Sequence, residues 1–403
     1  MTRFLVIASY ADSLIHFRGP LLDALIAKGY EVHAASPDIG SDNKWRRQLE
    51  KKGIRVHEIG LQRTGMNPVA DLKTLGELYC LMRRIRPEVV MGYTIKPVIY
   101  GTLGARLARI PRRFVLVTGL GYAFTSDASA RAFGKRQAVL TIVRTLYRLA
   151  LSGAHKVFFQ NPDDQALFLQ QKVLSPRVPS HVVNGSGIDL EQYVVAPRAE
   201  GPCRFLLIGR LLGDKGVREY VEAARQVRRT HPLATFALAG WIDDNPDAID
   251  RHELDDWIAD GTIDFLGSLD DVRPAIAACH AYVLPSYREG TPRTVLEAMA
   301  MGRAVITSDA PGCRETVVEG VNGYLVPVRD ASFLASAMLR FIECPELIDT
   351  MGRKSREIVE AKYDVNKVNE DILGQMGIGP GTGCRRNDTG VDELRGYHGK
   401  TSL

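Results

Sequence analysis

Several features that mark particular protein classes are scarce in this chain. The six cysteines stand singly, at Cys80, Cys203, Cys279, Cys313, Cys344 and Cys384. Without paired spacing they indicate neither a disulfide framework nor a zinc site, and we expect reduced, mostly buried thiols. No apolar run approaches the about 18 residues needed to span a bilayer, and the stretch after Met1 is too short for a signal peptide. The sequence therefore predicts a protein that stays in the cytoplasm.

Aromatic residues are also few, at 7% of the chain, and they are not interleaved with basic residues as in RNA-binding sheets. The charge is uneven along the chain. Residues 1–200 carry 28 Lys and Arg against 16 Asp and Glu, a net of +12, and the remainder carries a net of −7. A basic half favours an anionic partner. With nucleic acid set aside, a phosphorylated substrate or a membrane surface remains.

The length of 403 residues predicts two domains, because a single hydrophobic core stops growing at about 250 to 300 residues. A strand at Arg3–Ala8, a helix at Phe17–Gly29 ended by glycine and a strand at Glu31–Ala35 form a βαβ opening, which implies a parallel sheet. A second series begins at Cys203–Gly209. The pattern is typical of an α/β protein with two doubly wound sheets, joined near Val195–Pro202.

The same rhythm predicts further elements along both series. These are strands at Val89–Gly92, Phe114–Thr118, Lys156–Gln160, Thr235–Ala239, Thr262–Leu266, Ala281–Pro285 and Ala304–Thr307, and helices at Pro97–Arg109, Pro162–Lys172 and Gly216–His231. We expect a first domain over residues 1–195 and a second over 196–376, with its last helix packing back on the first. Residues 377–403 lack hydrophobic periodicity and read as a disordered tail.

The most informative stretch, LPSYREGTPRTVLEAMAMGRAVI, runs from Leu284 to Ile306. A strand gives way to a loop, and Thr291 with Pro292 is typical of the N-cap and first position of a helix that Gly302 ends. The N-terminus of a helix presents unpaired N–H groups and a partial positive charge. Together with the backbone of Gly290, it is suited to bind a diphosphate.

Two carboxylates flank this predicted anion site: Glu289 in the loop and Glu297 on the helix. Beside a diphosphate, their expected partners are neutral hydroxyl groups, because a carboxylate accepts paired hydrogen bonds from a sugar or a ribose. The alternative is two glutamates on an ordinary surface helix.

A second set of polar residues opens the second series, where RFLLIGRLLGDKGV runs from a strand through a turn into a helix. Arg210 and Lys215 follow the strand at its C-terminal end, the edge at which open α/β sheets bind ligands. Two cations there could neutralise a nucleoside diphosphate leaving group. A solvated loop and helix start is the alternative.

Together these stretches resemble the retaining glycosyltransferases of the GT-B fold, glycosyltransferase family 4 or glycosyl transferases group 1. That family carries an Arg…Lys pair after the first strand of its donor domain and a Glu-x7-Glu motif. The resemblance implies two Rossmann-like domains facing across a cleft and a UDP-sugar donor. It implies that Arg210 and Lys215 hold the β-phosphate, that Glu289 contacts the donor sugar and that Glu297 contacts the ribose. The implied donor site also includes Gly209, Gly290, Thr291, Pro292 and Arg293.

Four segments are similar to bacterial transferases that extend undecaprenyl-diphosphate-linked sugars: LIHFRGPLLDAL, YTIKPVIYG, VTGLGYAFT and SYREGTPRTVLEAMAMG. Within these transferases, the segments resemble the branch that adds α-1,3-linked N-acetylgalactosamine to diphospho-undecaprenyl-linked diacetylbacillosamine. Thr118 departs from that branch, some members of which carry an acid there. The similarity implies a lipid-linked sugar acceptor, a place at the inner face of the cytoplasmic membrane and a function in surface polysaccharide or glycan assembly.

The acceptor residues predicted for the N-terminal half are His16, Phe17, Arg18, Lys96, Thr118 and Gly119. In this fold they open onto the cleft between the domains, and we expect Arg18 and Lys96 to meet the acceptor diphosphate. Two alternatives stay open. His16 could make a helix-entry hydrogen bond, and Gly119 with Gly121 could form a tight turn that binds no ligand.

The segment Arg131–Leu151 predicts an amphipathic helix. One face carries the apolar residues Val139, Ile142, Val143, Leu146 and Ala150. The opposite face carries Arg144 and Arg148, and these two arginines are bordered by Leu140, Tyr147 and Leu151. Apolar residues beside cations suggest a helix lying on an anionic membrane. A core-packed helix with a solvated basic back is the alternative.

No nucleophile is poised beside a base in the sequence, so we expect a front-face mechanism that depends on positioning and on stabilising phosphate charge. Arg210, Lys215 and the helix dipole would supply that stabilisation without a metal, although Mg²⁺ could stimulate. A nucleotide-sugar epimerase of the same fold and a non-catalytic partner subunit remain alternatives. The two sugars and the linkage are not legible, because they depend on a few loop contacts.

Overall fold

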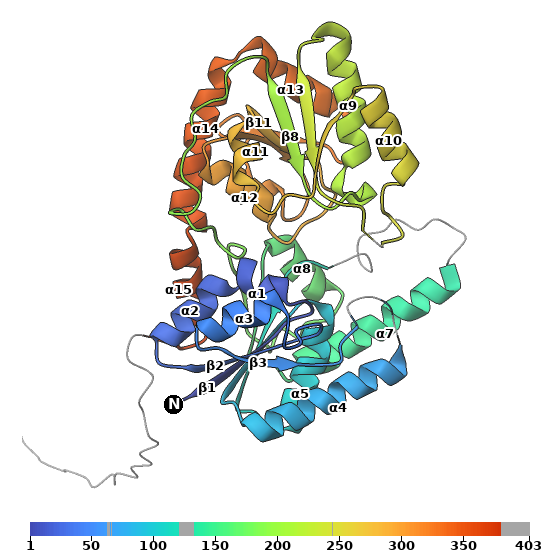
Figure 1. The fold of residues 1–403 in the computed structure, drawn as a ribbon. Helices are drawn as coiled ribbons and strands as arrows, with labels where there is room; N and C mark the ends of the chain where they lie inside the picture. The colour runs from blue at the N-terminus through green and yellow to red at the C-terminus, as the bar shows by residue number, and fades with distance from the viewer. Residues whose placement is uncertain (63–64, 66, 121–132, 244, 380–403) are drawn as a thin grey trace, which may run out of the picture.

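The computed structural model describes residues 1–62, 65, 67–120, 133–243 and 245–379, and only the backbone over 133–139. Within them the chain forms two fully parallel sheets, one of seven strands and one of six, each covered by helices. Figure 1 shows the two halves stacked, with the sheet of the N-terminal half below and that of the C-terminal half above. The two doubly wound α/β sheets predicted from the sequence are confirmed.

The N-terminal sheet has the order β3-β2-β1-β4-β5-β6-β7. Its strands are β1 Arg3–Ile7, β2 Glu31–Ser36, β3 Arg55–Glu58, β4 Val89–Tyr93, β5 Arg112–Val117, β6 Lys156–Phe159 and β7 Ser180–Val182. The helices between them are α1 Asp12–His16, α2 Gly19–Ala27, α3 Lys44–Lys51, α4 Pro68–Ile85, η1 Pro97–Gly101, α5 Thr102–Leu107, α7 Phe133–Leu151 and α8 Pro162–Gln170. The helix predicted from Phe17 to Gly29 corresponds to α2, and the short helix α1 that precedes it was not predicted.

Alternation along β1 shows how this sheet is buried on both faces. Phe4 and Val6 pack with α2 and α3, while Leu5 and Ile7 pack with α4 and α5. Successive side chains of a strand point to opposite faces. A parallel sheet covered on both faces therefore needs the uninterrupted apolar run found here.

The C-terminal sheet has the order β10-β9-β8-β11-β12-β13. Its strands are β8 Arg204–Ile208, β9 Thr235–Ala239, β10 Asp264–Gly267, β11 Ala281–Leu284, β12 Ala304–Ser308 and β13 Gly323–Val326. Its helical segments are η2 Gly213–Lys215, α9 Val217–Thr230, α10 Arg251–Ala259, α11 Arg273–Ala277, α12 Arg293–Ala300, η3 Arg314–Thr316, α13 Ala331–Glu343, α14 Glu346–Ile358 and η4 Val359–Tyr363.

The last helix, α15 (Val365–Gln375), returns to the N-terminal half and lies beside α2 (Figure 1). Ile372 and Leu373 are buried in the same core as β1 and α2. Ile378 joins that core at 1% exposure. The tail predicted from residue 377 was therefore placed too early, because a single apolar residue after a glycine carries no periodicity. Residues 380–403 lie outside the described part.

Two other expectations concern cysteines and membrane spans. All five cysteines of the described residues are free, but only Cys279 and Cys313 are buried, so the prediction of mostly buried thiols was wrong. Among the described helices, none combines the length and the apolar character needed to cross a membrane.

A stacked histidine pair on β2 and β3 predicts how stability depends on pH. Burial, together with the neighbouring His33, lowers the pKa of His57 to about 4, and His33 Nδ1 lies 2.9 Å from His57 Nε2. Since the pKa is depressed on folding, the unfolded chain takes up the proton first. The free energy of unfolding should therefore be highest above the ordinary histidine pKa and fall as the pH drops toward 4. Urea unfolding at several pH values measures this slope. His57→Gln should flatten it, and equal slopes in both proteins would contradict the assignment.

Candidate active site

The C-terminal ends of the two sheets face one another across a cleft that holds two adjoining cavities of about 260 and 300 Å³. Both cavities are lined by residues of the two halves. They share Tyr10, Thr94, Thr118, Arg210, Lys215, Glu289 and Gly290. Residues that are far apart in the sequence, and that were predicted separately as donor and acceptor residues, therefore meet in one space.

The end of β8 supplies two cations to this cleft. Arg210 follows Gly209 and donates from Nη1 to Asp243 Oδ2 at 2.9 Å. Lys215 lies in η2, and Gly216 after it has a left-handed backbone with φ of 72°. A Cβ on Gly216 would overlap the carbonyl group of Pro285. Glycine at this position therefore lets the turn after β8 approach the end of β11, which brings Lys215 to the loop that carries Glu289.

Lys215 and Glu289 form an ion pair through Nζ and Oε1, with side chains 16% and 15% exposed. Arg293 Nε likewise donates to Glu297 Oε1 at 2.9 Å. The sequence predicted hydroxyl groups of a bound sugar and ribose as partners of the two carboxylates; it did not predict that each is paired with a cation of its own half. A carboxylate in a partly buried cleft is stabilised by the nearest cation until a ligand replaces it.

The helix that follows the loop begins one residue later than predicted. Pro292 is the N-cap of α12 and makes no side-chain cap. Thr291 Oγ1 instead donates to the carbonyl oxygen of Gln160 in the other half at 3.0 Å. Gly302, with φ of 75°, follows the helix as predicted. Val295 and Leu296 donate their N–H groups to the carbonyl oxygen of Pro292, but the N-cap offers no side-chain acceptor to those of Arg293 and Thr294. Thr291, Pro292 and Arg293 line the cavity at this end of α12.

Glu297, one turn into α12, is 5% exposed and accepts from Tyr193 Oη at 3.0 Å as well as from Arg293. It is absent from the lining of both cavities. Its predicted ribose contact therefore stays a prediction, and the hydrogen bonds from Tyr193 and Arg293 both end on its Oε1. Arg293 also reaches across the cleft, where its guanidinium donates to the carbonyl oxygen of His16 and lies 5.4 Å from the Phe17 ring centre.

At Gly290 the two halves approach each other closely. A Cβ there would lie 2.5 Å from the carbonyl oxygen of Thr118 and would also overlap Gln160 Oε1. Gly119, with φ of 126°, faces Gly290 from the other side. Thr118 and Gly119 thus line the cleft, and Gly290 is the glycine that the close contact between the halves requires. Gly121 lies outside the described residues.

Arg18 is a buried cation in the wall of the first cavity. It is 2% exposed, and its Nε has no hydrogen-bond partner among the described residues. Its guanidinium lies 5.2 Å from the Tyr93 ring centre, and Tyr93 Oη is hydrogen-bonded to Ser13 Oγ at 2.7 Å. Burial lowers the pKa of Arg18 to about 10, so it stays protonated. A buried cation with no acidic partner in the described part of the chain is suited to an anionic ligand.

The other predicted acceptor residues differ in their positions. Lys96 lines the second cavity, but its Nζ is paired with Asp71 Oδ1 at 2.8 Å. Its charge is therefore already compensated. His16 ends α1 as an exposed side chain paired with Asp12 at 3.0 Å, outside the lining of either cavity. The pair lies within α1 and is not the helix-entry hydrogen bond considered as the alternative, and the acceptor contact of His16 stays a prediction.

Two residues of the second cavity were missed in the sequence. Asp214, next to Lys215, has a buried Oδ1 with no partner among the described residues, and burial raises the pKa of its carboxyl. Arg288, next to Glu289, contacts Asp164 of the other half. Their adjacency to motif residues was the available signal. Across the described ranges, no group of three or more His, Cys, Asp and Glu side chains could hold a metal.

The helix predicted to lie on a membrane, α7, is rotated relative to the expectation. Tyr147 and Leu151, expected beside the arginines at the surface, are 1% and 0% exposed and pack in the core with Phe168. Ile142 and Leu149 are instead 47% and 52% exposed. Periodicity could not decide this, because apolar residues occur around most of the helix. Arg131 lies outside the described residues.

Comparisons with known proteins agree with this arrangement. Residues 7–161 match the family described as glycosyl transferase 4-like, and residues 202–344 match glycosyl transferases group 1. The N,N'-diacetylbacillosaminyl-diphospho-undecaprenol alpha-1,3-N-acetylgalactosaminyltransferase of Campylobacter jejuni is 28% identical over 376 residues, 90% of this chain and 94% of that protein. The UDP-Gal:alpha-D-GlcNAc-diphosphoundecaprenol alpha-1,3-galactosyltransferase of Escherichia coli is 25% identical, over 74% of this chain and 77% of that protein.

Solved structures show the same fold. Sucrose-phosphate synthase from Thermosynechococcus elongatus superposes with a TM-score of 0.78 at 20% identity, covering 94% of this chain and 98% of that one. Anabaena HepE in complex with UDP-glucose superposes with a TM-score of 0.70 at 20% identity, covering 94% and 100%. The chain therefore belongs to the GT-B glycosyltransferases, with a glycosyl transferase 4-like region followed by a glycosyl transferases group 1 region.

Proposed function

We propose that this glycosyltransferase moves a hexose or N-acetylhexosamine, with retention, from a UDP-sugar to an undecaprenyl-diphosphate-linked sugar during surface polysaccharide or glycan assembly. The observation that carries the proposal is the meeting of Arg210, Lys215, Glu289 and the N-terminus of α12 in one cleft, opposite the buried Arg18. The names of the Campylobacter and Escherichia relatives support the lipid-linked acceptor. The proposed domain division is 1–195 for the acceptor and 196–376 for the donor.

On the donor side, Arg210, Lys215 and the N–H groups at the start of α12 bind the diphosphate. Entry of the diphosphate draws Lys215 away from Glu289, which then accepts hydrogen bonds from hydroxyl groups of the donor sugar. Gly209 and Gly290 allow the backbone to lie close to the ligand. In this proposal the ion pair seen without ligand keeps both charges stabilised until the donor arrives.

The transfer step follows the front-face course. The acceptor hydroxyl attacks the anomeric carbon on the side from which the diphosphate leaves, so the new C–O bond forms as the old one breaks. The hydroxyl proton passes to the departing phosphate oxygen. Arg210 and Lys215 stabilise the charge that develops there, and preorganised charges of this kind are usually the largest single contribution to catalysis. Mg²⁺ is not required in this scheme.

On the acceptor side, Arg18 holds the acceptor diphosphate, while Phe17, Thr118 and Gly119 line the path to the anomeric carbon. Lys96 takes part only if its pair with Asp71 opens. The convergence of Arg18 with the donor cations in one cavity supports a reaction between two diphosphate-bearing substrates.

The sharpest test is a screen of UDP-sugars against lipid-diphosphate-linked sugars, with the stereochemistry of the product assigned by NMR. Retained configuration and release of UDP are expected. Conversion of a UDP-sugar alone into another UDP-sugar would indicate the epimerase instead. Failure to bind any UDP-sugar by calorimetry would indicate a non-catalytic subunit.

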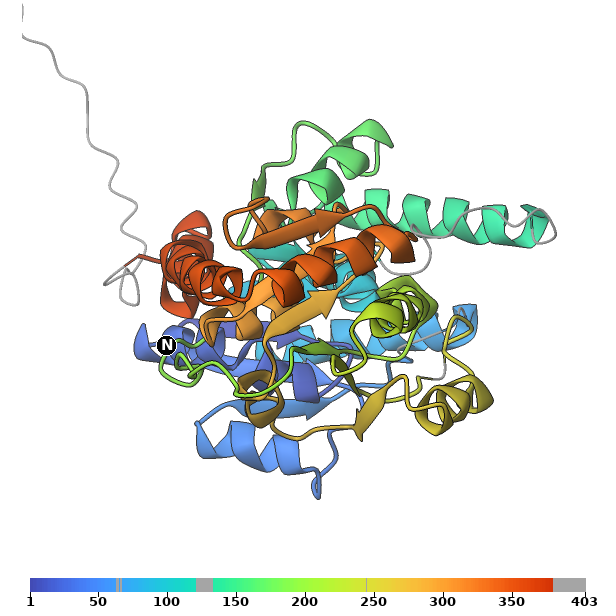
Figure 2. The ribbon, with the colours of Figure 1, turned by 90° about the horizontal axis from the view of Figure 1, so that it is seen from above.

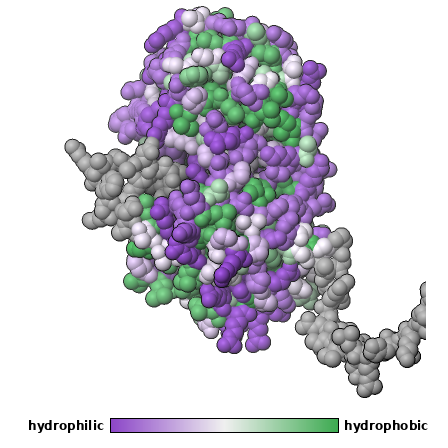
Figure 3. All heavy atoms as spheres, turned by 180° about the vertical axis from the view of Figure 1, so that it is seen from behind, coloured by the Kyte–Doolittle hydropathy of each residue, from purple (hydrophilic) through white to green (hydrophobic). Residues whose placement is uncertain are grey.

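Docking of α7 on anionic lipid completes the proposal. The helix projects beyond the rest of the N-terminal half in two perpendicular views (Figures 1 and 2) and carries the exposed Ile142, Leu149 and Arg148. Figure 3 shows the molecule from behind, so that α4, α5 and α7, at the lower right in Figure 1, come to lie at the lower left. Hydrophobic residues are visible at that lower left side. Exposed apolar residues beside a cation suit the boundary of an anionic bilayer.

This arrangement makes a prediction that differs from the pair Arg144 and Arg148 suggested by the sequence, because Arg144 is half-buried. Changing Ile142 and Leu149 to Ser together with Arg148→Glu should weaken binding to anionic vesicles at least about tenfold, since each cation near the surface contributes about 1 kcal/mol. Vesicle sedimentation at low and high salt measures it. Arg229→Glu, an exposed charge reversal in the other half, should bind like the wild type. Equal binding by the triple variant would contradict the docking surface.

A further inference from the structure

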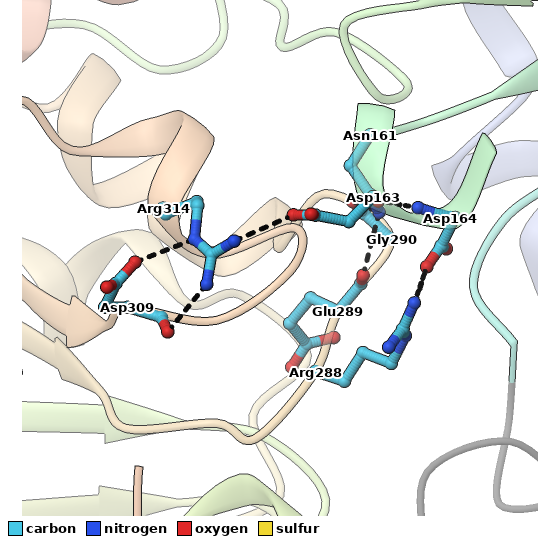
Figure 4. Close-up of polar contacts among 8 residues, drawn as sticks. All are labelled: Asn161, Asp163, Asp164, Arg288, Glu289, Gly290, Asp309 and Arg314. Atoms are coloured by element: carbon cyan, nitrogen blue, oxygen red, sulfur yellow. Dashed lines mark hydrogen bonds and ion pairs between the residues drawn. The ribbon is translucent and has the colours of Figure 1, made fainter. Parts of the chain in front are cut away.

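The loop that carries Glu289 is held by the other half of the molecule. Asn161, the residue before α8, is fully buried, and its Nδ2 donates to the carbonyl oxygens of Glu289 at 3.1 Å and Gly290 at 2.9 Å. Figure 4 shows the start of α8 facing this loop, with Asn161 directed at the backbone of Glu289 and Gly290. One amide group thus fixes two consecutive carbonyl groups beside the Glu289 side chain.

A buried ion pair adds to this contact. Asp164, in the first turn of α8, is 1% exposed in its side chain and accepts from Nε of Arg288 at 3.1 Å and from its Nη2. Burial raises the pKa of Asp164, and the charge of Arg288 opposes that rise. Arg288 immediately precedes Glu289. A paired guanidinium and carboxylate have a planar, directional geometry, so the pair fixes the orientation of the loop as well as its distance.

The loop is also fixed from its own half. The backbone N–H of Glu289 donates to the carbonyl oxygen of Pro311 at 2.9 Å. Glu289 is therefore held between Pro311 on one side and Asn161 on the other, and Thr291 donates to Gln160 just beyond it. Every one of these contacts except that of Pro311 comes from residues 160–164.

At the rim of the same interface lies a pair with different properties. Asp163 accepts from Arg314 Nη1 at 3.1 Å, and Arg314 also contacts Asp309 (Figure 4). The side chains of Asp163 and Arg314 are 37% and 39% exposed. Solvent-exposed pairs contribute little energy. This pair joins the same two halves through the same turn of α8 without contacting the Glu289 loop.

We propose that Asn161 and Asp164 are positioning residues, which place the Glu289 carboxylate for the donor sugar through the backbone of residues 288–290. The proposal rests on the donor role of Glu289 in the proposed function. It means that the donor site is complete only when the two halves are docked, since the acceptor half supplies the contacts that orient a donor-binding side chain.

Asn161→Ser is the main test, because serine keeps the N-cap that Asn161 provides to Asp164 but cannot reach both carbonyl groups. We expect kcat to fall about 10- to 100-fold, as misplacement of a catalytic group by about 1 Å can cost 100-fold. The KM for the lipid-linked acceptor should change less than about twofold. Asp164→Asn keeps the shape of the side chain, removes its charge and should act in the same direction.

A double variant distinguishes positioning from a structural role. If Asn161 acts through Glu289, Asn161→Ser combined with Glu289→Gln should be no slower than Glu289→Gln alone, because coupled residues are not additive. Asp163→Asn is the matched control and should keep transfer near the wild-type rate. Additive losses in the double variant, or equal losses in Asn161→Ser and Asp163→Asn, would overturn the proposal.

Hydrogen exchange gives a readout that needs no substrate. The peptide covering residues 287–291 should exchange faster in Asn161→Ser and in Asp164→Asn than in the wild type. In Asp163→Asn its exchange should equal that of the wild type. If neither Asn161→Ser nor Asp164→Asn changes the exchange of this peptide, the positioning role is refuted even if the enzyme is active. If the wild type transfers no sugar, yet Asn161→Ser and Asp164→Asn still exchange faster than it does, the proposed function is refuted and the hold of Asn161 and Asp164 on the loop stands.

Discussion

Lys215→Ala and Glu289→Ala should each lower the rate of glycosyl transfer about 100- to 1000-fold, which corresponds to about 2.7 to 4 kcal/mol of transition-state stabilisation. Lys215 is expected to stabilise charge on the departing phosphate, and Glu289 to orient the donor sugar. Both side chains lie in the cleft between the two halves. Their contribution is electrostatic and local, so the fold should survive. Steady-state kinetics with the preferred UDP-sugar and circular dichroism of each variant make the measurement.

The ion pair between the two residues sharpens this prediction. Removing one partner leaves the other charge unpaired in a partly buried cleft. The double variant should therefore be at least as stable to heat as either single variant, while its rate stays low. Arg225→Ala serves as the control. It breaks an exposed ion pair with Asp260 in the C-terminal half, and neither residue lines the cavities of the cleft. Turnover near that of the control in either Lys215→Ala or Glu289→Ala would refute the site.

Arg18→Met should lower the rate of glycosyl transfer about 100-fold. Without added ligand, the variant should be at least as stable as the wild type. Arg18 is buried without a hydrogen-bond partner for its Nε. An unpaired cation in a low-dielectric site is unfavourable until an anion binds. Methionine fills similar space without the charge, so the folded state no longer carries that penalty. Thermal unfolding without ligand tests the expected stability. Transfer assays with a lipid-linked acceptor test the expected loss of rate.

A ligand-binding experiment separates an anion site from a structural cation. Pyrophosphate should raise the unfolding temperature of the wild type more than that of Arg18→Met, because a ligand that binds only the folded state stabilises it. Lys96→Met serves for comparison, since Lys96 is already paired with Asp71. It should show a smaller loss of transfer. An Arg18→Met protein that unfolds several degrees lower, with normal transfer, would assign Arg18 to the core instead.

Much of the fold followed from local pattern. The strands at Arg3–Ile7 and Thr235–Ala239 were readable because a parallel strand covered on both faces is an apolar run between turn residues. The short strand Ser180–Val182 was missed, because its three residues are all half-buried and give no such run. The helix α1 was also missed, because its five residues are too few to show a helical period.

The candidate site was predicted in part. Arg210, Lys215 and Glu289 were found because each follows the C-terminal end of a strand, and parallel strands bring those ends to one edge. Arg288 and Asp164 were not, because their partners lie more than a hundred residues away in the sequence. Glu297 was found as a motif residue, but its burial beneath Arg293 and Tyr193 was not foreseeable.

The sequence by itself determined the two parallel sheets, the helix that begins beside the glutamate loop and the cations at the strand ends, because these depend on residues near one another in the chain. Only the tertiary structure decided which charges pair, which face of α7 is exposed and how the halves dock. Those outcomes depend on contacts between distant segments. The ion pair of Lys215 with Glu289 requires β8 and β11 to lie side by side in one sheet. The hold of Asn161 on the donor loop exists only once the two sheets face each other.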